Sequence, residues 1–288
     1  MTAPEVRLLA SGLRFGEGPR WHHGRLWFSD MYDHQVKTIG LDGRLEVKVD
    51  LPGQPSGLGW TPDGDLLIVS MRERQLLRVD HDRLVVHAEL GDVATWHCND
   101  MVVDAEGRAY VGNFGFDLHA AEAAGDFSSA RSAAMALVHP DGSVEVAADD
   151  LAFPNGTVIT PDGSTLIVAE SMGRRLTAFD RGADGRLSNR RVWADLGRRL
   201  PDGICLDAEG CVWFANAGGN ECVRVAEGGE VRQVVVTDRP AYACMLGGPE
   251  GRHLFMLTSS SSHPDQCLAH RDAQVVVAEV TVPHAGTP

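Results

Sequence analysis

One hairpin-like unit recurs along the chain and constrains its fold more than any other feature. Residues 201–216 read as a Pro-Asp-Gly entry, a short apolar stretch, a polar turn ending in glycine, and a second apolar stretch, which is the pattern of a β-hairpin. Similar units begin at Glu17, Ser56, Asn99, Asn155, Asp202 and Cys244. Their turn glycines are Gly24, Gly64, Gly107, Gly163, Gly210 and Gly251, separated by 40, 43, 56, 47 and 41 residues. Six repeats at this period predict an all-β protein, a six-bladed β-propeller with four-stranded blades around a central channel.

The repeats leave little of the chain outside such a ring, so residues 1–288 are expected to form a single propeller domain. Residues 5–10 and 274–282 each resemble a strand without a blade of its own. We expect these amino- and carboxyl-terminal strands to share one blade and close the ring. The longest interval contains an insertion rich in Ala and Ser, residues 116–134. A surface loop is its simpler interpretation, and a lid over the channel mouth is the alternative.

Charge and composition narrow the classes of partner. The chain has 26 Lys and Arg against 40 Asp and Glu, a formal net charge of −14, which predicts binding neither to nucleic acid nor to an anionic membrane. The first residues lack the pattern of a signal peptide and no run of about 18 apolar residues occurs, so we expect a cytoplasmic protein. Six cysteines without C-x-x-C spacing are expected to be free thiols. The sequence leaves the oligomeric state open.

The repeat alignment also predicts a site. One residue of each repeat begins the innermost strand, so six side chains should converge on the channel axis: Glu17, Ser56, Asn99, Asn155, Asp202 and Cys244. Two carboxylates and two carboxamides around one axis suit a hard divalent cation, with coordination positions left for water or substrate. We expect Ser56 to be a small polar filler and Cys244 a packed thiol.

Four short motifs connect this chain with a known family. Residues 17–21 (EGPRW), 99–100 (ND), 153–156 (FPNG) and 201–203 (PDG) together resemble the senescence marker protein/gluconolactonase family, also called the regucalcin family, over almost the whole chain. The resemblance implies a six-bladed propeller that binds one divalent ion through Glu17, Asn155 and Asp202. It implies that Asn99 contacts the substrate or completes the shell of the ion, and that lactone hydrolysis is the commonest activity.

A mechanism follows from those residues. The cation would polarise the lactone carbonyl, Asp202 would take a proton from the attacking water and return it to the leaving alkoxide, and Asn99 would orient the substrate. In sugar-lactone hydrolases of the family the position two before this Asn is often an arginine, and here it is His97. If His97 lines the pocket, a ring less polar than a sugar-acid lactone becomes a candidate substrate. All-oxygen ligation favours Ca²⁺, Mg²⁺ or Mn²⁺ over zinc. We expect Ca²⁺, with Mg²⁺, Mn²⁺, Zn²⁺ and Fe²⁺ as alternatives.

Two other functions stay open at this point. A phosphotriester or fluorophosphate hydrolase, of the diisopropyl fluorophosphatase type, would place a phosphoryl oxygen where the lactone carbonyl would lie. A non-catalytic calcium-binding propeller would keep the ion and lack turnover. The chain contains no G-x-S-x-G, no H-E-x-x-H and no phosphate-binding glycine loop, so serine-hydrolase, zincin and nucleotide-binding chemistries are not indicated.

Overall fold

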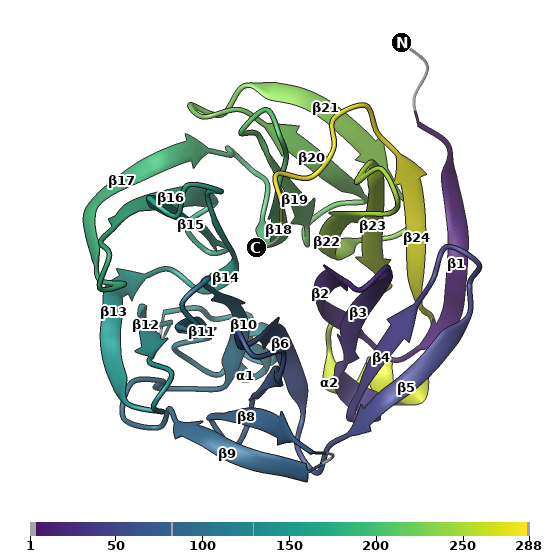
Figure 1. Ribbon diagram of the computed structural model, residues 1–288. Coiled ribbons are helices and arrows are strands. Elements are labelled where there is room, and N and C mark those ends of the chain that lie inside the picture. The colour runs from purple at the N-terminus through teal and green to yellow at the C-terminus, as the bar shows by residue number, and fades with distance from the viewer. Residues whose placement is uncertain (1–3, 82, 129, 287–288) are drawn as a thin grey trace.

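Six antiparallel sheets of four strands surround a central channel (Figure 1). The computed structural model describes residues 4–81, 83–128 and 130–286. The predicted all-β propeller with four-stranded blades is confirmed. In every blade the strand that begins the repeat is innermost, and the following strands lie successively farther from the axis.

The first three blades follow the chain order. Blade 1 contains β2 (Gly16–His22), β3 (Arg25–Asp30), β4 (Gln35–Ile39) and β5 (Leu45–Asp50). Blade 2 contains β6 (Pro55–Trp60), β7 (Leu66–Ser70), β8 (Gln75–Asp80) and β9 (Arg83–Glu89). Blade 3 contains β10 (Cys98–Val103), β11 (Ala109–Asn113), β12 (Ala133–Val138) and β13 (Val144–Leu151).

The remaining blades include the one that closes the ring. Blade 4 contains β14 (Pro154–Ile159), β15 (Thr165–Glu170), β16 (Arg175–Arg181) and β17 (Leu187–Asp195). Blade 5 contains β18 (Pro201–Leu206), β19 (Val212–Asn216), β20 (Glu221–Val225) and β21 (Val231–Val236). Blade 6 contains β22 (Ala241–Gly247), β23 (His253–Thr258), β24 (Ala273–Glu279) and, as its outermost strand, β1 (Val6–Leu13).

The blade-closing prediction is therefore confirmed. β1 pairs antiparallel with β24, with Val6 opposite Ala278 and Leu13 opposite Ala273. Figure 1 shows the two strands side by side at the outer edge of the ring, although they lie at opposite ends of the chain. Pairing covers the edge that β24 would otherwise expose, and it joins the ends of the sequence without a covalent link.

The hairpin turns form where the sequence supplies glycine. All six turn glycines have positive φ, between 69° and 92°, a region that residues with a Cβ rarely adopt. The two inner strands of each blade are almost wholly buried, whereas outer strands such as β5 and β13 alternate between exposed and half-buried residues. This pattern places the core between adjacent blades, where large side chains such as Phe28, Trp213 and Phe255 are fully buried.

In the part of the chain that the structure describes, three short helices lie outside the sheets: η1 (Met31–Asp33), α1 (Leu118–Ala124) and α2 (Pro264–Ala269). Among the described residues, no helix is both long and apolar enough to span a membrane. All six cysteines are free and buried, as the sequence predicts.

Candidate active site

The polar residues predicted to face the axis meet in one cavity. Glu17, Asn99, Asn155 and Asp202 all line a space of about 250 Å³. Each is at most 8% exposed. Ser56 and Cys244 are buried beside it rather than lining it. The Ser56 hydroxyl donates to the Asn99 side-chain oxygen over 3.4 Å.

Glycines bring the innermost strands close enough for these side chains to meet. A Cβ at Gly156 would lie 2.4 Å from the backbone nitrogen of Ile204, and one at Gly203 would lie 2.7 Å from the Cα of Ala243. No side chain fits at either position without moving the neighbouring strand. The residue that precedes each glycine, Asn155 or Asp202, is thereby held near its counterpart in the adjacent blade.

The electrostatics of the cavity favour a cation. Burial raises the pKa of Glu17 well above its ordinary value, and the charges of Asp202 and Asp100 raise it further. Burial likewise raises the pKa of Asp202, with Asp100 adding to the effect and a hydrogen bond from Asn155 opposing it. Within the described part of the chain, neither Glu17 nor Asp202 forms an ion pair with a basic side chain. The charge of Arg20 lowers the pKa of Glu17 without forming an ion pair with it. Two buried carboxylates that lack a direct ion-pair partner are the arrangement that a divalent ion stabilises.

The cavity offers both carboxylate and carboxamide oxygens as possible ligands for a cation. No three His, Cys, Asp or Glu side chains of the described residues are grouped as a metal site. A cation here would therefore combine the carboxylates of Glu17 and Asp202 with the carboxamide oxygen of Asn155. The nitrogen of that carboxamide donates to the Ser171 hydroxyl over 3.2 Å, and Ser171 in turn donates to the Pro201 carbonyl over 2.6 Å. This chain of hydrogen bonds fixes the orientation of the Asn155 side chain.

A buried ion pair lies on the other side of these carboxylates. The guanidinium of Arg20 lies 3.1 Å from the Asp100 carboxylate and also donates to the carbonyls of Pro19 and Met101. Arg20 lines the two spaces that open toward the opposite face, but not the cavity that holds Glu17. The Arg20–Asp100 pair therefore forms a floor between the cavity and the rest of the channel.

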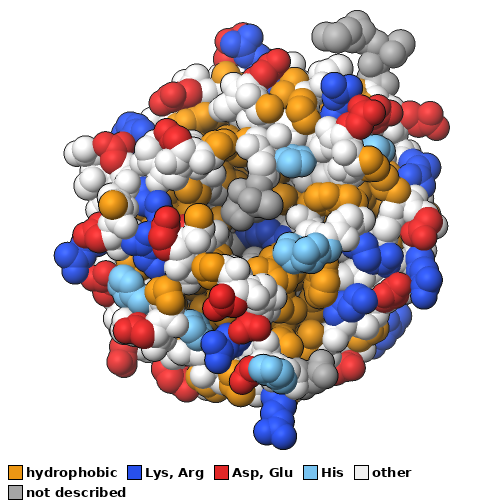
Figure 2. Space-filling model, in the orientation of Figure 1, with side chains coloured by type: hydrophobic (Ala, Val, Ile, Leu, Met, Phe, Trp, Pro, Cys, Tyr) orange, Lys and Arg blue, Asp and Glu red, His pale blue; other side chains and the backbone are white. Residues whose placement is uncertain are grey.

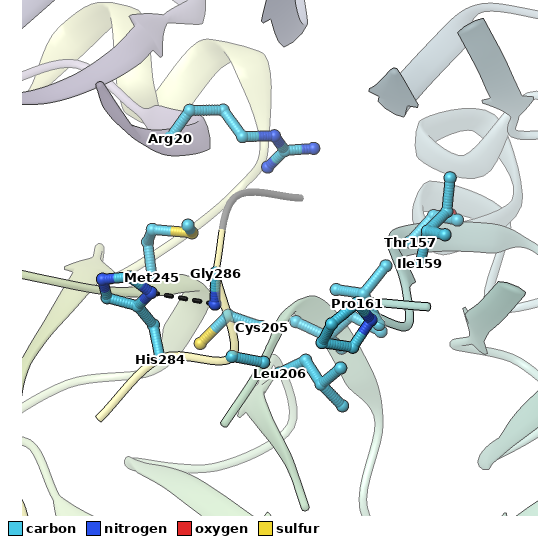
Figure 3. A pocket seen from close by; sticks show the side chains of 12 residues that line it. Arg20, Thr157, Ile159, Pro161, Cys205, Leu206, Met245, His284 and Gly286 are labelled. Atoms are coloured by element: carbon cyan, nitrogen blue, oxygen red, sulfur yellow. Dashed lines mark hydrogen bonds between the residues drawn. The ribbon is translucent and has the colours of Figure 1, made fainter. Parts of the chain in front are cut away.

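The opposite face is partly filled by the carboxyl-terminal segment. Figure 2 shows this face hollowed at its centre. Figure 3 shows His284 and Gly286 across a small space from Arg20, with the Gly286 nitrogen donating to His284 Nδ1 over 3.0 Å. Backbone bonds from Ala285 to Leu206 and from His284 to Gly251 attach the segment to blades 5 and 6. Access to the cavity is thus from the face that carries α1 and α2.

A second ring of side chains lies nearer the mouth. The residue two positions before each axial residue lies at, or just before, the start of the innermost strand. All six such residues line the cavity: Phe15, Gln54, His97, Phe153, Leu200 and Tyr242. We call them the upper ring. The sequence analysis identified only His97, although extending the repeat alignment by two positions in each repeat would have singled out the other five.

Aromatic contacts pack one side of the upper ring. His97 stacks on Trp96, with ring centroids 5.0 Å apart, and the ring of Phe114 lies 4.6 Å from that of Phe153. Phe153 has a φ of 64°, an unusual backbone conformation for a bulky residue and one often found at functional sites. Burial lowers the pKa of His97, and the positive charge of Arg72 lowers it further. His97 therefore contributes an uncharged ring to the wall at neutral pH.

The helices and the ends of the second strands complete the mouth. Leu118, His119 and Glu122 of α1 line the cavity. Pro264, the first residue of α2, and Ser262, which precedes that helix, also line it. The rings of His119 and His263 are 5.4 Å apart, so the two helices meet beside the opening. The insertion at 116–134 is thus more than the surface loop we favoured, because its helix forms part of the cavity wall. Residue 129 of that insertion lies outside the described residues.

Comparison with known proteins identifies the family. The family described as SMP-30/Gluconolactonase/LRE-like region matches residues 15–260, a range that contains every predicted site residue. The chain belongs to this family. Regucalcin of Xenopus laevis is 24% identical over 269 residues, spanning 91% of this chain and 88% of its own length. Pentonolactonase XacC of Haloferax volcanii is 27% identical over 266 residues, spanning 88% of this chain and 84% of its own.

A solved structure agrees with the fold of this SMP-30/gluconolactonase family member. A protein of Agrobacterium tumefaciens, described as a calcium-binding protein, regucalcin, superposes with a TM-score of 0.80 at 21% identity. The alignment covers 100% of this chain and 96% of that one. At this level of identity the likeness supports the six-bladed fold, and the chemistry depends on the residues of the cavity.

Proposed function

We propose that this protein is a divalent-metal-dependent hydrolase that opens the ring of a small lactone. The observation that carries the proposal is the pair of buried carboxylates, Glu17 and Asp202, which share a cavity with two carboxamides and have no basic partner among the described side chains. A pentonolactonase among the relatives, and a calcium-binding protein among the similar structures, support this choice within the family.

Glu17, Asn155 and Asp202 would hold the ion. Oxygen ligands favour Ca²⁺, and Mg²⁺, Mn²⁺, Zn²⁺ or Fe²⁺ remain candidates. When bound, the ion would supply positive charge to a lactone carbonyl and to the oxygen on which negative charge develops during attack. The same positive charge would favour the ionised forms of Glu17 and Asp202, whose pKa values burial raises.

The side chains of the protein would orient the substrate and transfer the proton. The Asn99 carboxamide, whose oxygen accepts from Ser56, would orient the lactone from the blade 3 side. A carboxylate oxygen of Asp202 would accept a proton as the water oxygen bonds to the carbonyl carbon. The ring C–O bond then breaks, and the same proton passes to the departing ring oxygen. The product is the hydroxy acid, with atoms and charge balanced.

Replacing Asp202 tests this assignment. We expect Asp202→Asn to lower kcat/KM for the best lactone substrate by about 1,000-fold or more, because it removes both the proton acceptor and one anionic ligand. Asp63→Asn, an exposed acid on the β6–β7 turn, is the matched control and should keep wild-type activity. Ring opening is followed with a pH indicator and folding by circular dichroism. A folded Asp202→Asn enzyme within about tenfold of wild type would refute the role of Asp202.

A further inference from the structure

The wall above the carboxylates is unusual for a site that would receive a sugar lactone. Four of the six upper-ring residues carry apolar or aromatic bodies: Phe15, Phe153, Leu200 and Tyr242. Three of these four, all but Leu200, join one buried apolar cluster with the side chains at the ends of the second strands, Met31, Met71 and Phe114. Each hydroxyl of a sugar acid held against this wall would lose water and find few groups to bond with. The wall therefore suits a flat apolar ring.

Several polar groups near the mouth already have partners inside the protein. The Tyr32 hydroxyl donates to the Ser262 carbonyl over 2.9 Å. Glu122 pairs with His119 over 3.3 Å. These groups have partners inside the protein and are less available to a substrate.

Arg72 is a charged side chain at the mouth that lacks such a partner among the described residues. It lies two residues after β7, lines the cavity, and is the one Lys or Arg among the described residues that does so. Its side chain is exposed and makes no ion pair within the described part of the chain, and the acid next to it, Glu73, accepts instead from the Ser70 hydroxyl over 2.7 Å. A guanidinium without a counter-ion at the edge of an apolar cavity is suited to binding a carboxylate in a bidentate manner.

We propose that the substrate is a lactone with a flat apolar or aromatic body that bears a carboxylate, and that Arg72 binds this carboxylate. The inference rests on the proposed lactonase function and specifies its substrate class. The lactone ring would lie on the Glu17–Asp202 side, the apolar body against the upper ring, and the carboxylate at the mouth. A cavity of about 250 Å³ accommodates a bicyclic lactone with one small substituent.

A set of matched compounds tests the proposal. The substrates are an aromatic γ-lactone (phthalide) with a carboxylate on its benzene ring, the isosteric compound with a carboxamide at that position, and glucono-δ-lactone. The variant is Arg72→Gln, and the control is Arg252→Gln, an exposed arginine near the β22–β23 turn. We expect Arg72→Gln to raise KM for the carboxylate compound about tenfold or more while kcat is retained. For the carboxamide compound we expect KM and kcat to change by less than about threefold.

Binding provides a second readout that does not depend on turnover. Lactams of the same skeletons resist hydrolysis, and their affinities for the metal-loaded protein are measured by calorimetry. We expect the acid lactam to bind wild type more tightly than the amide lactam, and Arg72→Gln to abolish that preference. Equal affinities for the two lactams, or equal losses for both in the variant, would overturn the role of Arg72.

The two proposals fail in different ways. If glucono-δ-lactone is a better substrate than the aromatic acid and Arg72→Gln leaves it unaffected, the lactonase stands and the substrate class proposed here is wrong. If no lactone is opened while the acid lactam binds through Arg72, the lactonase function is wrong and the site is one for binding an aromatic acid.

Discussion

At the scale of single residues, buried charges organise the channel. Glu17, Asp100 and Asp202 are three buried carboxylates, each at most 8% exposed, and burial is the largest influence that raises the pKa of each. Among the residues that the structure describes, Arg20 is the one basic residue that forms an ion pair with any of them, through Asp100. The floor of the cavity thus depends on one guanidinium, and the carboxylates above it are left for a cation.

Removing that guanidinium should be costly. We expect Arg20→Met to lower the free energy of unfolding by about 3–5 kcal/mol, because it leaves the Asp100 carboxylate buried without a partner. Adding Asp100→Asn should restore at least half of the loss, since it removes the uncompensated charge. The free energies of unfolding are measured by urea denaturation of wild type and both variants, with a chelator present so that all are compared without bound metal. A loss below about 1 kcal/mol in the single variant, or simple additivity in the double one, would contradict this account.

At the scale of elements, the sequence predicts the features that depend on local residue preferences and on the spacing of the repeats. Turn glycines and apolar strands identify the six hairpins, and unpaired terminal strands identify the closure of β1 on β24. Extending the alignment by two positions in each repeat would also single out the upper ring, of which the sequence analysis recognised His97 alone. The axial placement of Glu17 and Asp202 followed from aligning the repeats.

Other elements could not be predicted in this way. α1 has seven residues and α2 has six, too short for stability without tertiary packing, so their positions depend on docking at the mouth. The Asp117 side chain caps α1 by accepting from the Ala120 nitrogen, and Gly125 ends it in a left-handed conformation. These local signals indicate a helix, but not that it borders the cavity. Arg72 was missed because it follows a second strand rather than beginning a first one.

At the scale of the whole molecule, an ionic hub supports the closure of the ring. Asp33, in η1 of blade 1, accepts from Arg14 just after β1, from Lys37 of β4, and from Arg271 just before β24. The donor–acceptor distances are between 2.7 and 2.9 Å. Blade 1 is thereby joined to both strands of the closing pair. Burial alone would raise the pKa of Asp33, but hydrogen bonds from Arg271, Lys37 and Arg14 outweigh it and hold that pKa well below its ordinary value.

The hub predicts a pH dependence of stability. Because the pKa of Asp33 is lower in the folded than in the unfolded state, its contribution is complete above the unfolded value, about pH 4, and is lost as the pH falls through the folded value. We expect Asp33→Asn to lower the free energy of unfolding by roughly 1–3 kcal/mol at pH 7. The difference from wild type should shrink below about pH 4, as measured by urea denaturation across pH. A deficit that stays constant down to about pH 2 would show that Asp33 acts other than through its charge.

The central claim is that the carboxylates of the channel hold an ion on which lactone opening depends. The most direct test is lactone turnover by metal-stripped protein before and after titration with Ca²⁺, Mg²⁺, Mn²⁺ or Zn²⁺, with binding stoichiometry measured on the same sample. We predict no turnover above the uncatalysed rate in the stripped protein, and saturable recovery as about one ion binds per chain. Turnover that is unchanged by thorough chelation would contradict the claim.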